Sequence, residues 1–231
     1  QLREPLDFYG VTDHAMFMGV APVAADPRSE LSRFPFTEVL HNLNAPDNMD
    51  RWSLPSRVGS FGGLLAGLVP GMANGEIDPE ELLSITRRAW ADTINAADMF
   101  NDPGHFTTFV AYEYSPALPD RGKHHRNVIF RTDAAPEYAV SAVDAASEID
   151  LWKQLGAQCS GPCEFLTIPH NPNKSWGLAF ASETIDGIPY TQDDWFLRRR
   201  LEPLVEMFQI KGSSECAFGF GATDEECGFE Q

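Results

Sequence analysis

Residues Leu6–His14 have the sequence Leu-Asp-Phe-Tyr-Gly-Val-Thr-Asp-His. The segment is apolar and rich in β-forming residues, and it ends abruptly on an acid, Asp13, and an imidazole, His14. Buried parallel strands have this pattern when their carboxyl ends supply side chains to the mouth of an α/β barrel or sheet. The segment therefore predicts a rigid strand that carries chemically active side chains at its carboxyl end.

Three other segments repeat this arrangement of a β-type run beside one residue that can ligate a metal. They are Phe109–Glu113, His125–Phe130 and Phe165–His170. A lone histidine at a strand end is more often a hydrogen-bonded structural residue, and a lone glutamate can be an ordinary ion-pair partner. Four such residues at the ends of four β-type runs favour a shared site. We expect a metal site formed by His14, Glu113, His125 and His170.

The ligand types indicate which metals would bind. Imidazole and carboxylate together suit zinc, manganese or iron rather than calcium. Glu113 is the natural bridging residue, because a carboxylate has two oxygens and can contact two cations. Two metals about 4 Å apart could clamp a phosphoester and activate a water for attack. Asp13 is expected to take part in catalysis by orienting a ligand imidazole or the water.

The roles of residues beside the expected ligands follow from their positions. His124 and His125 are adjacent, and neighbouring residues on a strand point to opposite faces, so only His125 is expected to reach the site. His41 and His105 are expected to be structural or solvated, and Arg198, Arg199 and Arg200 to form a solvated helix face. Surface cations are usually solvated, but four residues are candidate contacts for an anionic substrate: Arg126, Asn171, Lys174 and Lys211.

Composition indicates a globular protein. Hydrophobic residues make up 43% and aromatic residues 11% of the 231-residue chain, which argues against disorder. No apolar run approaches the roughly 20 residues needed to cross a bilayer, so no transmembrane segment is expected. The net charge is −17 and the pI about 4.6. Such a chain repels phosphate backbones, which argues against general nucleic-acid binding.

The cysteines occur as two close pairs, Cys159/Cys163 and Cys216/Cys227. An even count in local pairs favours disulfides and an oxidising compartment, with a zinc site or buried thiols as alternatives. The sequence Cys-Ser-Gly-Pro-Cys at the first pair favours a turn and could close a tight disulfide loop. We expect a periplasmic or secreted protein, with the cytoplasm as the alternative.

Local patterns place the main helices and strands. Asp78-Pro79-Glu80-Glu81 is a helix start with a cap, a proline at the first position and acids in the first turn. Further helices are expected at 145–155 and 192–201, and strands at 105–114, 126–130, 165–169 and 204–210. The glycine-rich segment 58–69 matches no nucleotide-binding motif, and we expect a closely packed helix or loop there. Strands alternating with helices favour an α/β fold built on parallel strands, in one domain over residues 1–231.

The order of these motifs resembles that of the PHP (polymerase and histidinol phosphatase) superfamily of metal-dependent phosphoesterases. Leu6–His14 looks like its strand ending in Thr-Asp-His, and Val110–Glu113 looks like the strand ending in a metal-bridging glutamate. The segments His125–Ile129 and Ile168–Asn171 are similar to its next two histidine motifs. Residues 124–130, 168–175 and 202–215 look more closely like a bacterial PHP-like family of unknown function, whose members are often exported.

This resemblance implies a fold and an activity. The fold is a distorted TIM-like (β/α)7 barrel with two or three divalent transition metals at the carboxyl ends of its strands. The activity is attack of a water or metal-bound hydroxide on a phosphoester. An opening His-x-His motif is expected before Gln1 and a closing Asp-x-His motif after Gln231, so the chain is expected to be an incomplete fragment of the barrel.

The leading functional hypothesis is a metal-dependent hydrolase, a phosphoesterase that acts on a small anionic substrate. One alternative is metal-assisted hydrolysis of another bond, such as an amide or a sulfate ester. A second alternative is a non-catalytic metal- or ligand-binding protein that retains the barrel. No Gly-x-Ser-x-Gly motif is present, so a serine hydrolase of that type has no support.

Overall fold

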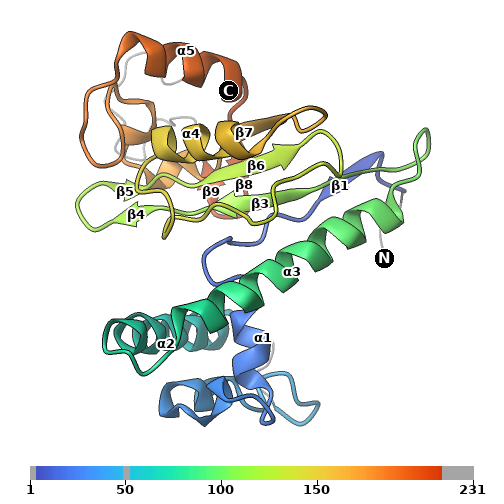
Figure 1. The fold of residues 1–231 in the computed structure, drawn as a ribbon, viewed down its shortest axis with the longest axis vertical. Helices are drawn as coiled ribbons and strands as arrows, with labels where there is room; N and C mark the ends of the chain where they lie inside the picture. The colour runs from blue at the N-terminus through green and yellow to red at the C-terminus, as the bar shows by residue number, and fades with distance from the viewer. Residues whose placement is uncertain (1–3, 49–52, 215–231) are drawn as a thin grey trace. The chain divides into compact units, whose positions relative to one another are not determined.

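The computed structural model describes residues 4–48 and 53–214. The chain forms two compact units (Figure 1), one built from residues 1–16 with 93–231 and the other from residues 17–92. Along the chain, the smaller unit is inserted between the two segments of the larger one. The single domain expected over residues 1–231 therefore stays a prediction. None of the helices in the described ranges combines the length and apolar character that a membrane span requires.

The smaller unit is helical. It contains α1 (Val20–Ala25), the 3-10 helices η1 (Leu31–Arg33) and η2 (Pro35–Leu40), α2 (Leu54–Ala73) and the start of α3 (Pro79–Phe100). Its core is entirely apolar and consists of Val20, Ala24, Leu31, Leu40, Leu64, Leu68, Ile77, Leu82 and Ile85. The glycine-rich segment forms part of α2, and a Cβ at Gly67 would lie 2.1 Å from the ring of Phe36. Glycine is therefore needed for the close packing that the sequence predicts here.

The start of α3 follows the predicted capping pattern. Pro79 is the first helical residue, with Glu80 and Glu81 in the first turn. The Asp78 carboxylate accepts a hydrogen bond from the backbone N–H of Glu80 at 3.0 Å. One of the amides that a helix start leaves without a partner is thereby satisfied. The predicted helix start at Asp78 is confirmed.

The larger unit is organised around a three-stranded sheet in the order β3-β6-β7. The strands are β3 (Ala111–Tyr114), β6 (Arg126–Phe130) and β7 (Phe165–Pro169), and both pairings are antiparallel. The expectation of parallel strands is wrong for this sheet. The link from β3 to β6 holds only the small hairpin of β4 (Ala117–Leu118) and β5 (Gly122–Lys123). Such a link is too short for the crossover that a parallel pair needs.

Parallel pairing occurs at the start of the unit. Strand β1 (Phe8–Gly10) pairs in parallel with β2 (Thr107–Phe109), where the sequence predicts one longer strand over 105–114. The two chain segments stay side by side beyond these strands, because His14 and Glu113 form an isolated parallel bridge. The predicted strand at Leu6–His14 is therefore present in part, and its carboxyl end lies against β3.

The two faces of the sheet differ. Along β6, buried residues alternate with half-buried ones, as expected when only one face is covered. The covered face packs on α4 (Glu148–Gln158), which lies along the sheet in Figure 1. There the Trp152 indole donates a hydrogen bond to Thr167 Oγ1 at 3.0 Å. Glu113 lies on the other face, since its neighbour Tyr114 donates to the carbonyl of Ala145, in the segment just before α4.

The sheets within the described ranges are open, and none closes into a barrel. The mixed α/β class predicted from the sequence is confirmed at this level. The segment 204–210, expected to be a strand, is mostly irregular and holds only β8 (Phe208–Gln209), which forms a hairpin with β9 (Gly212–Ser213). Helix α5 (Gln192–Leu201) matches its predicted range and begins at a capping box between Thr191 and Asp194.

Arg198 corrects one expectation for α5. Its side chain is only 11% exposed, so it does not belong to a solvated helix face. The guanidinium donates to the Ala179 carbonyl at 2.6 Å and to Glu202 at 3.3 Å. It also lies over the rings of three aromatic residues, Phe180, Tyr190 and Trp195. Stacking of a planar guanidinium on aromatic faces offsets the cost of removing it from water.

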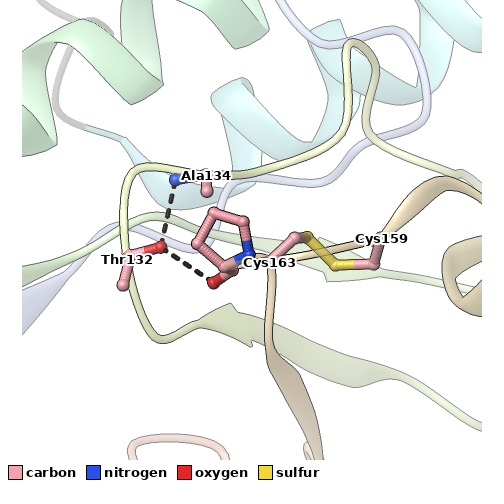
Figure 2. Close-up of a disulfide and its surroundings, with 5 residues drawn as sticks. Thr132, Ala134, Cys159 and Cys163 are labelled. Carbon is pink, nitrogen blue, oxygen red and sulfur yellow. Dashed lines mark hydrogen bonds between the residues drawn. A yellow bond between two sulfur atoms is a disulfide. The ribbon is translucent and has the colours of Figure 1, made fainter.

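The predicted disulfide between Cys159 and Cys163 is present (Figure 2). It closes a short loop between α4 and β7. The same loop is linked to Thr132, whose hydroxyl donates to the Pro162 carbonyl at 3.4 Å and accepts from the Ala134 amide at 3.2 Å (Figure 2). Cys216 and Cys227 lie outside the described residues.

Removal of this disulfide should lower the free energy of unfolding by less than removal of a disulfide that closes a long loop. The bridge spans a sequence separation of 4, and a loop of this size gives about 2 kcal/mol of chain-entropy stabilisation. We expect the Cys159→Ser/Cys163→Ser double variant to lose about this amount of unfolding free energy, measured by urea denaturation. An unchanged denaturation midpoint at an unchanged slope would contradict the prediction.

Candidate metal centre

Strand pairing brings the predicted ligands together. His14 is the bridge partner of Glu113, and the contact is held by hydrogen bonds from the Ala15 amide to the Glu113 carbonyl at 2.9 Å and from the Glu113 amide to the Asp13 carbonyl at 2.8 Å. The β6–β7 ladder continues past its last assigned pair, since the His170 amide donates to the His125 carbonyl at 2.9 Å. Side chains opposite each other in neighbouring strands share a face.

Glu113 lies at the centre of the cluster. Its Oε1 is 2.5 Å from His125 Nδ1 and 3.5 Å from His14 Nδ1, and its Oε2 is 3.8 Å from His170 Nε2. The ligand-capable atoms of His14, Glu113 and His125 all lie within 4.8 Å of one another. The convergence that the sequence predicts is therefore observed for the side chains of all four residues.

The cluster is buried on one side and open on the other. The side chains of Glu113 and His125 are 8% and 9% exposed, whereas that of His14 is 44% exposed. Ser115 bridges the two sides, because its hydroxyl contacts His14 Nδ1 and lies 3.2 Å from Glu113 Oε1. Solvent and small molecules can therefore approach the cluster along His14.

The charges within the cluster keep it ready to bind a cation. Burial by itself would raise the pKa of the Glu113 carboxyl, but the neighbouring imidazoles of His125, His14 and His170 outweigh it and lower that pKa. Burial also lowers the pKa of His14, as do the charges of His125, Lys211 and His170, against the opposing effect of Glu113. An ionised carboxylate beside a neutral imidazole is the protonation state that metal binding requires.

His170 is held by an acid that no local pattern in the sequence singles out. Its Nδ1 lies 2.9 Å from Glu206 Oε2, and the same carboxylate accepts a hydrogen bond from the Asn171 amide at 2.9 Å. A carboxylate on one ring nitrogen sets the tautomer and aims the other nitrogen at the metal. Here the other nitrogen, Nε2, is the one that lies near Glu113.

The donor atoms fit a transition metal. His125 Nδ1 and Glu113 Oε1 are both buried and lie 2.5 Å apart. The side-chain oxygen of Asn127 is buried without a partner within the described ranges, and Asn127 is the register partner of Glu113. Buried polar atoms of this kind are costly unless something else satisfies them. Nitrogen and carboxylate donors together match zinc, manganese or iron.

The residues expected to contact a substrate differ in their exposure to solvent. Arg126 has no exposed surface and pairs with the buried Glu202 at 2.8 Å, so the assignment of Arg126 to substrate binding is wrong. The reason is its position in the strand, since it points to the face opposite His125, toward Trp152. Asn171 is buried beside His170, and Lys211 is exposed at the β8–β9 turn.

Two more assignments concern neighbours of the ligands. Asp13 is exposed and contributes its backbone carbonyl to the bridge with Glu113, so a catalytic role of its carboxylate stays a prediction. His124 points away from the cluster as expected and contacts the Arg121 carbonyl through Nε2 at 3.0 Å. In this geometry His125, and not His124, faces Glu113.

A sequence model described as "Protein of unknown function (DUF3604)" matches residues 1–231. The chain belongs to the DUF3604 family. No curated protein and no solved structure matches it. For this DUF3604 protein, the geometry of the cluster around Glu113 is therefore the main guide to function.

Glu206 offers a direct test of how this DUF3604 site is built. We expect Glu206→Gln to weaken metal binding by about 10- to 100-fold, because loss of a carboxylate behind a ligand histidine typically has this effect. Competition with a chromophoric chelator measures the affinity. Glu206→Asp should recover part of it, whereas the control Glu183→Gln, in which the carboxylate pairs with Arg121 and not with a candidate ligand, should match the wild type. Equal affinity in the Glu206→Gln variant would show that Glu206 does not position His170.

Proposed function

We propose that the protein is a metal-dependent hydrolase that acts on a small anionic substrate, most simply a phosphoester. The observation that carries this proposal is the convergence of three imidazoles on the two oxygens of one buried carboxylate, Glu113. Four residues distant in sequence seldom meet in this way unless they share a ligand. The PHP-like order of motifs supports the same interpretation.

The two oxygens of Glu113 divide the cluster into two halves. Oε1 faces His14 and His125, and Oε2 faces His170. His14, Glu113 and His125 would hold one cation, and His170 together with Glu113 would hold a second. Zinc, manganese and iron are the candidates. The resemblance to the PHP superfamily allows a third metal.

Bound divalent cations would supply Lewis acidity and lower the pKa of a coordinated water toward about 7. The side chains of this protein would position the metal ligands and admit the substrate. Ser115 contacts both His14 and Glu113 and would keep them aligned. Glu206 would hold His170 in one tautomer. The exposed side of His14 would admit substrate, and Lys211 would contribute positive charge beside it.

The proposed compartment rests on the disulfide. Cys159 and Cys163 are bonded, and disulfides persist in oxidising compartments and are rare in the cytosol of mesophiles. We therefore propose a periplasmic or secreted enzyme. Retention of the disulfide in protein isolated from its native compartment, measured by mass spectrometry after thiol alkylation, tests this part.

The experiment that tests the proposed activity begins with elemental analysis of the full-length protein, purified without a chelating tag. We expect bound zinc, manganese or iron, and metal-dependent release of nitrophenol from 4-nitrophenyl or bis(4-nitrophenyl) phosphate. Chelation should abolish turnover, and the lost metal should restore it. Bound metal with no turnover on phosphate, sulfate or anilide probes would instead support a metal-binding protein without catalysis. No bound metal, even after reconstitution, would overturn the proposal.

A further inference from the structure

A second candidate site lies in the larger unit, at the end of the sheet that carries the candidate ligand histidines. It is a cavity of about 450 Å³ between the β4–β5 hairpin and the loop that follows β7. Its walls combine apolar groups with two lysines, and they consist of Ala117, Leu118, Pro119, Gly122, Lys123, Lys174 and Trp176. Cavities with mostly apolar walls and a few charged groups are typical of binding sites for small molecules.

The distribution of lysine in the chain points to this place. The protein has a net charge of −17 and only four lysines, Lys123, Lys153, Lys174 and Lys211. Two of them line the cavity, and Lys211 is in the turn beside it, where its carbonyl accepts from Asn173. Among the described residues, none of these three forms an ion pair, whereas Lys153 lies 3.8 Å from Asp194. Two of the few lysines of an acidic protein therefore line one cavity, and positive charge there would suit an anion.

Trp176 gives the cavity a flat apolar surface. The residue is 65% exposed although it is large and aromatic. Its backbone has a φ of 56°, a conformation that bulky side chains rarely adopt. Ser175 fixes the loop just before it, since its buried hydroxyl donates to the Pro172 carbonyl at 2.7 Å. An indole held in an exposed position can stack on a planar ring.

The cavity is connected to the metal centre through short stretches of chain. Ala117 follows Ser115 by two residues, Lys123 precedes His125 by two, and Lys174 follows His170 by four. The two walls are in close contact, because a Cβ at Gly122 would lie 2.7 Å from the Lys174 carbonyl oxygen. A molecule seated in the cavity therefore lies at the same edge of the sheet as the candidate ligands.

We propose that this cavity binds a planar ring that carries an anionic group. The ring stacks on Trp176, and the anion pairs with Lys123 and Lys174. As a statement about substrate the inference rests on the proposed function: the cavity holds the anionic aryl part of a substrate whose scissile bond lies at the metal centre. As a binding site it is independent of the metals.

The probe is 2-naphthoate, titrated by calorimetry into full-length protein as purified. We expect measurable binding that weakens about ten-fold or more in Lys123→Ala/Lys174→Ala, because two charge-assisted contacts are lost. The uncharged analogue 2-naphthalenemethanol should bind at least about ten-fold more weakly than 2-naphthoate for the same reason. Lys153→Ala is the matched control and should behave as the wild type. Equal affinity in the double variant, or an equal loss in the control, would overturn the proposal.

The Glu113→Gln variant separates this inference from the proposed function. Its binding of 2-naphthoate should equal that of the wild type even where its metal is lost. Loss of binding in this variant would place the carboxylate of the probe at the metal centre and overturn the cavity as its site. A protein without metal or turnover that still binds 2-naphthoate through Lys123 and Lys174 would overturn the proposed function alone.

Discussion

Glu113→Gln should abolish both metal binding and hydrolysis. The substitution keeps the size of the side chain but removes the negative charge and one of the two oxygens that face the histidines. Loss of a residue that hydrogen-bonds to a metal ligand typically lowers metal affinity about 10- to 100-fold. Loss of a direct ligand should lower it further. We expect bound metal, measured by elemental analysis, to fall below about a tenth of the wild-type content, and turnover to fall with it.

Glu164→Gln is the matched control for this experiment. Glu164 is also a glutamate at the end of a strand, but its side chain is 61% exposed and pairs with Arg131 on the surface. Its metal content and turnover should equal those of the wild type. If Glu113→Gln keeps the metal content and turnover of the wild type, Glu113 is not a metal ligand. The proposed mechanism then loses its basis.

Arg126→Met should destabilise the fold strongly. Arg126 has no exposed surface, donates to Glu202 Oε2 at 2.8 Å and to the His124 carbonyl at 2.8 Å, and lies over the Trp152 ring. Methionine fills much of the same volume but leaves the buried Glu202 carboxylate with Arg198 alone. Breaking a buried ion pair by removing one partner costs about 3–5 kcal/mol.

Arg131→Met provides the comparison within the same sheet region. The Arg131 pair with Glu164 has a similar distance, 2.7 Å, but the arginine side chain is 74% exposed. Exposed pairs contribute about 0–1 kcal/mol, because water and salt screen them. Urea denaturation of both variants should therefore show a large loss for Arg126 and a small one for Arg131. A loss below about 1 kcal/mol in Arg126→Met would show that the buried pair does not hold α5 to the sheet.

The candidate ligand residues can be named from the sequence because their signal is local. Each of the four follows or precedes a short β-type run, and the residue types themselves restrict the chemistry to metal binding or structure. The choice of His125 over His124 is also local, since side chains alternate along a strand. The same holds for the Asp78 cap and for the Cys159–Cys163 disulfide, which join residues close in sequence.

The direction of the strands cannot be predicted from the same patterns. A buried run such as β6 has the same composition in a parallel or an antiparallel sheet, and the alternation of helices and strands favours the parallel arrangement, which is wrong for this sheet. The deciding feature is the link between β3 and β6, which forms the small β4–β5 hairpin. The antiparallel ladder still brings strand ends together, because β3 and β7 end where β6 begins.

The sequence by itself determined the residue types of the candidate site, the positions of α3, α4 and α5, and the mixed α/β class. Only the tertiary structure decided which residues support the site. Glu206 lies 36 positions from His170 in an irregular segment. Arg126 is separated by 76 positions from Glu202, and the pair that they form buries Arg126 completely. The physical reason is that periodicity and capping report interactions between near neighbours in the chain, whereas these contacts depend on how the sheet and α5 pack.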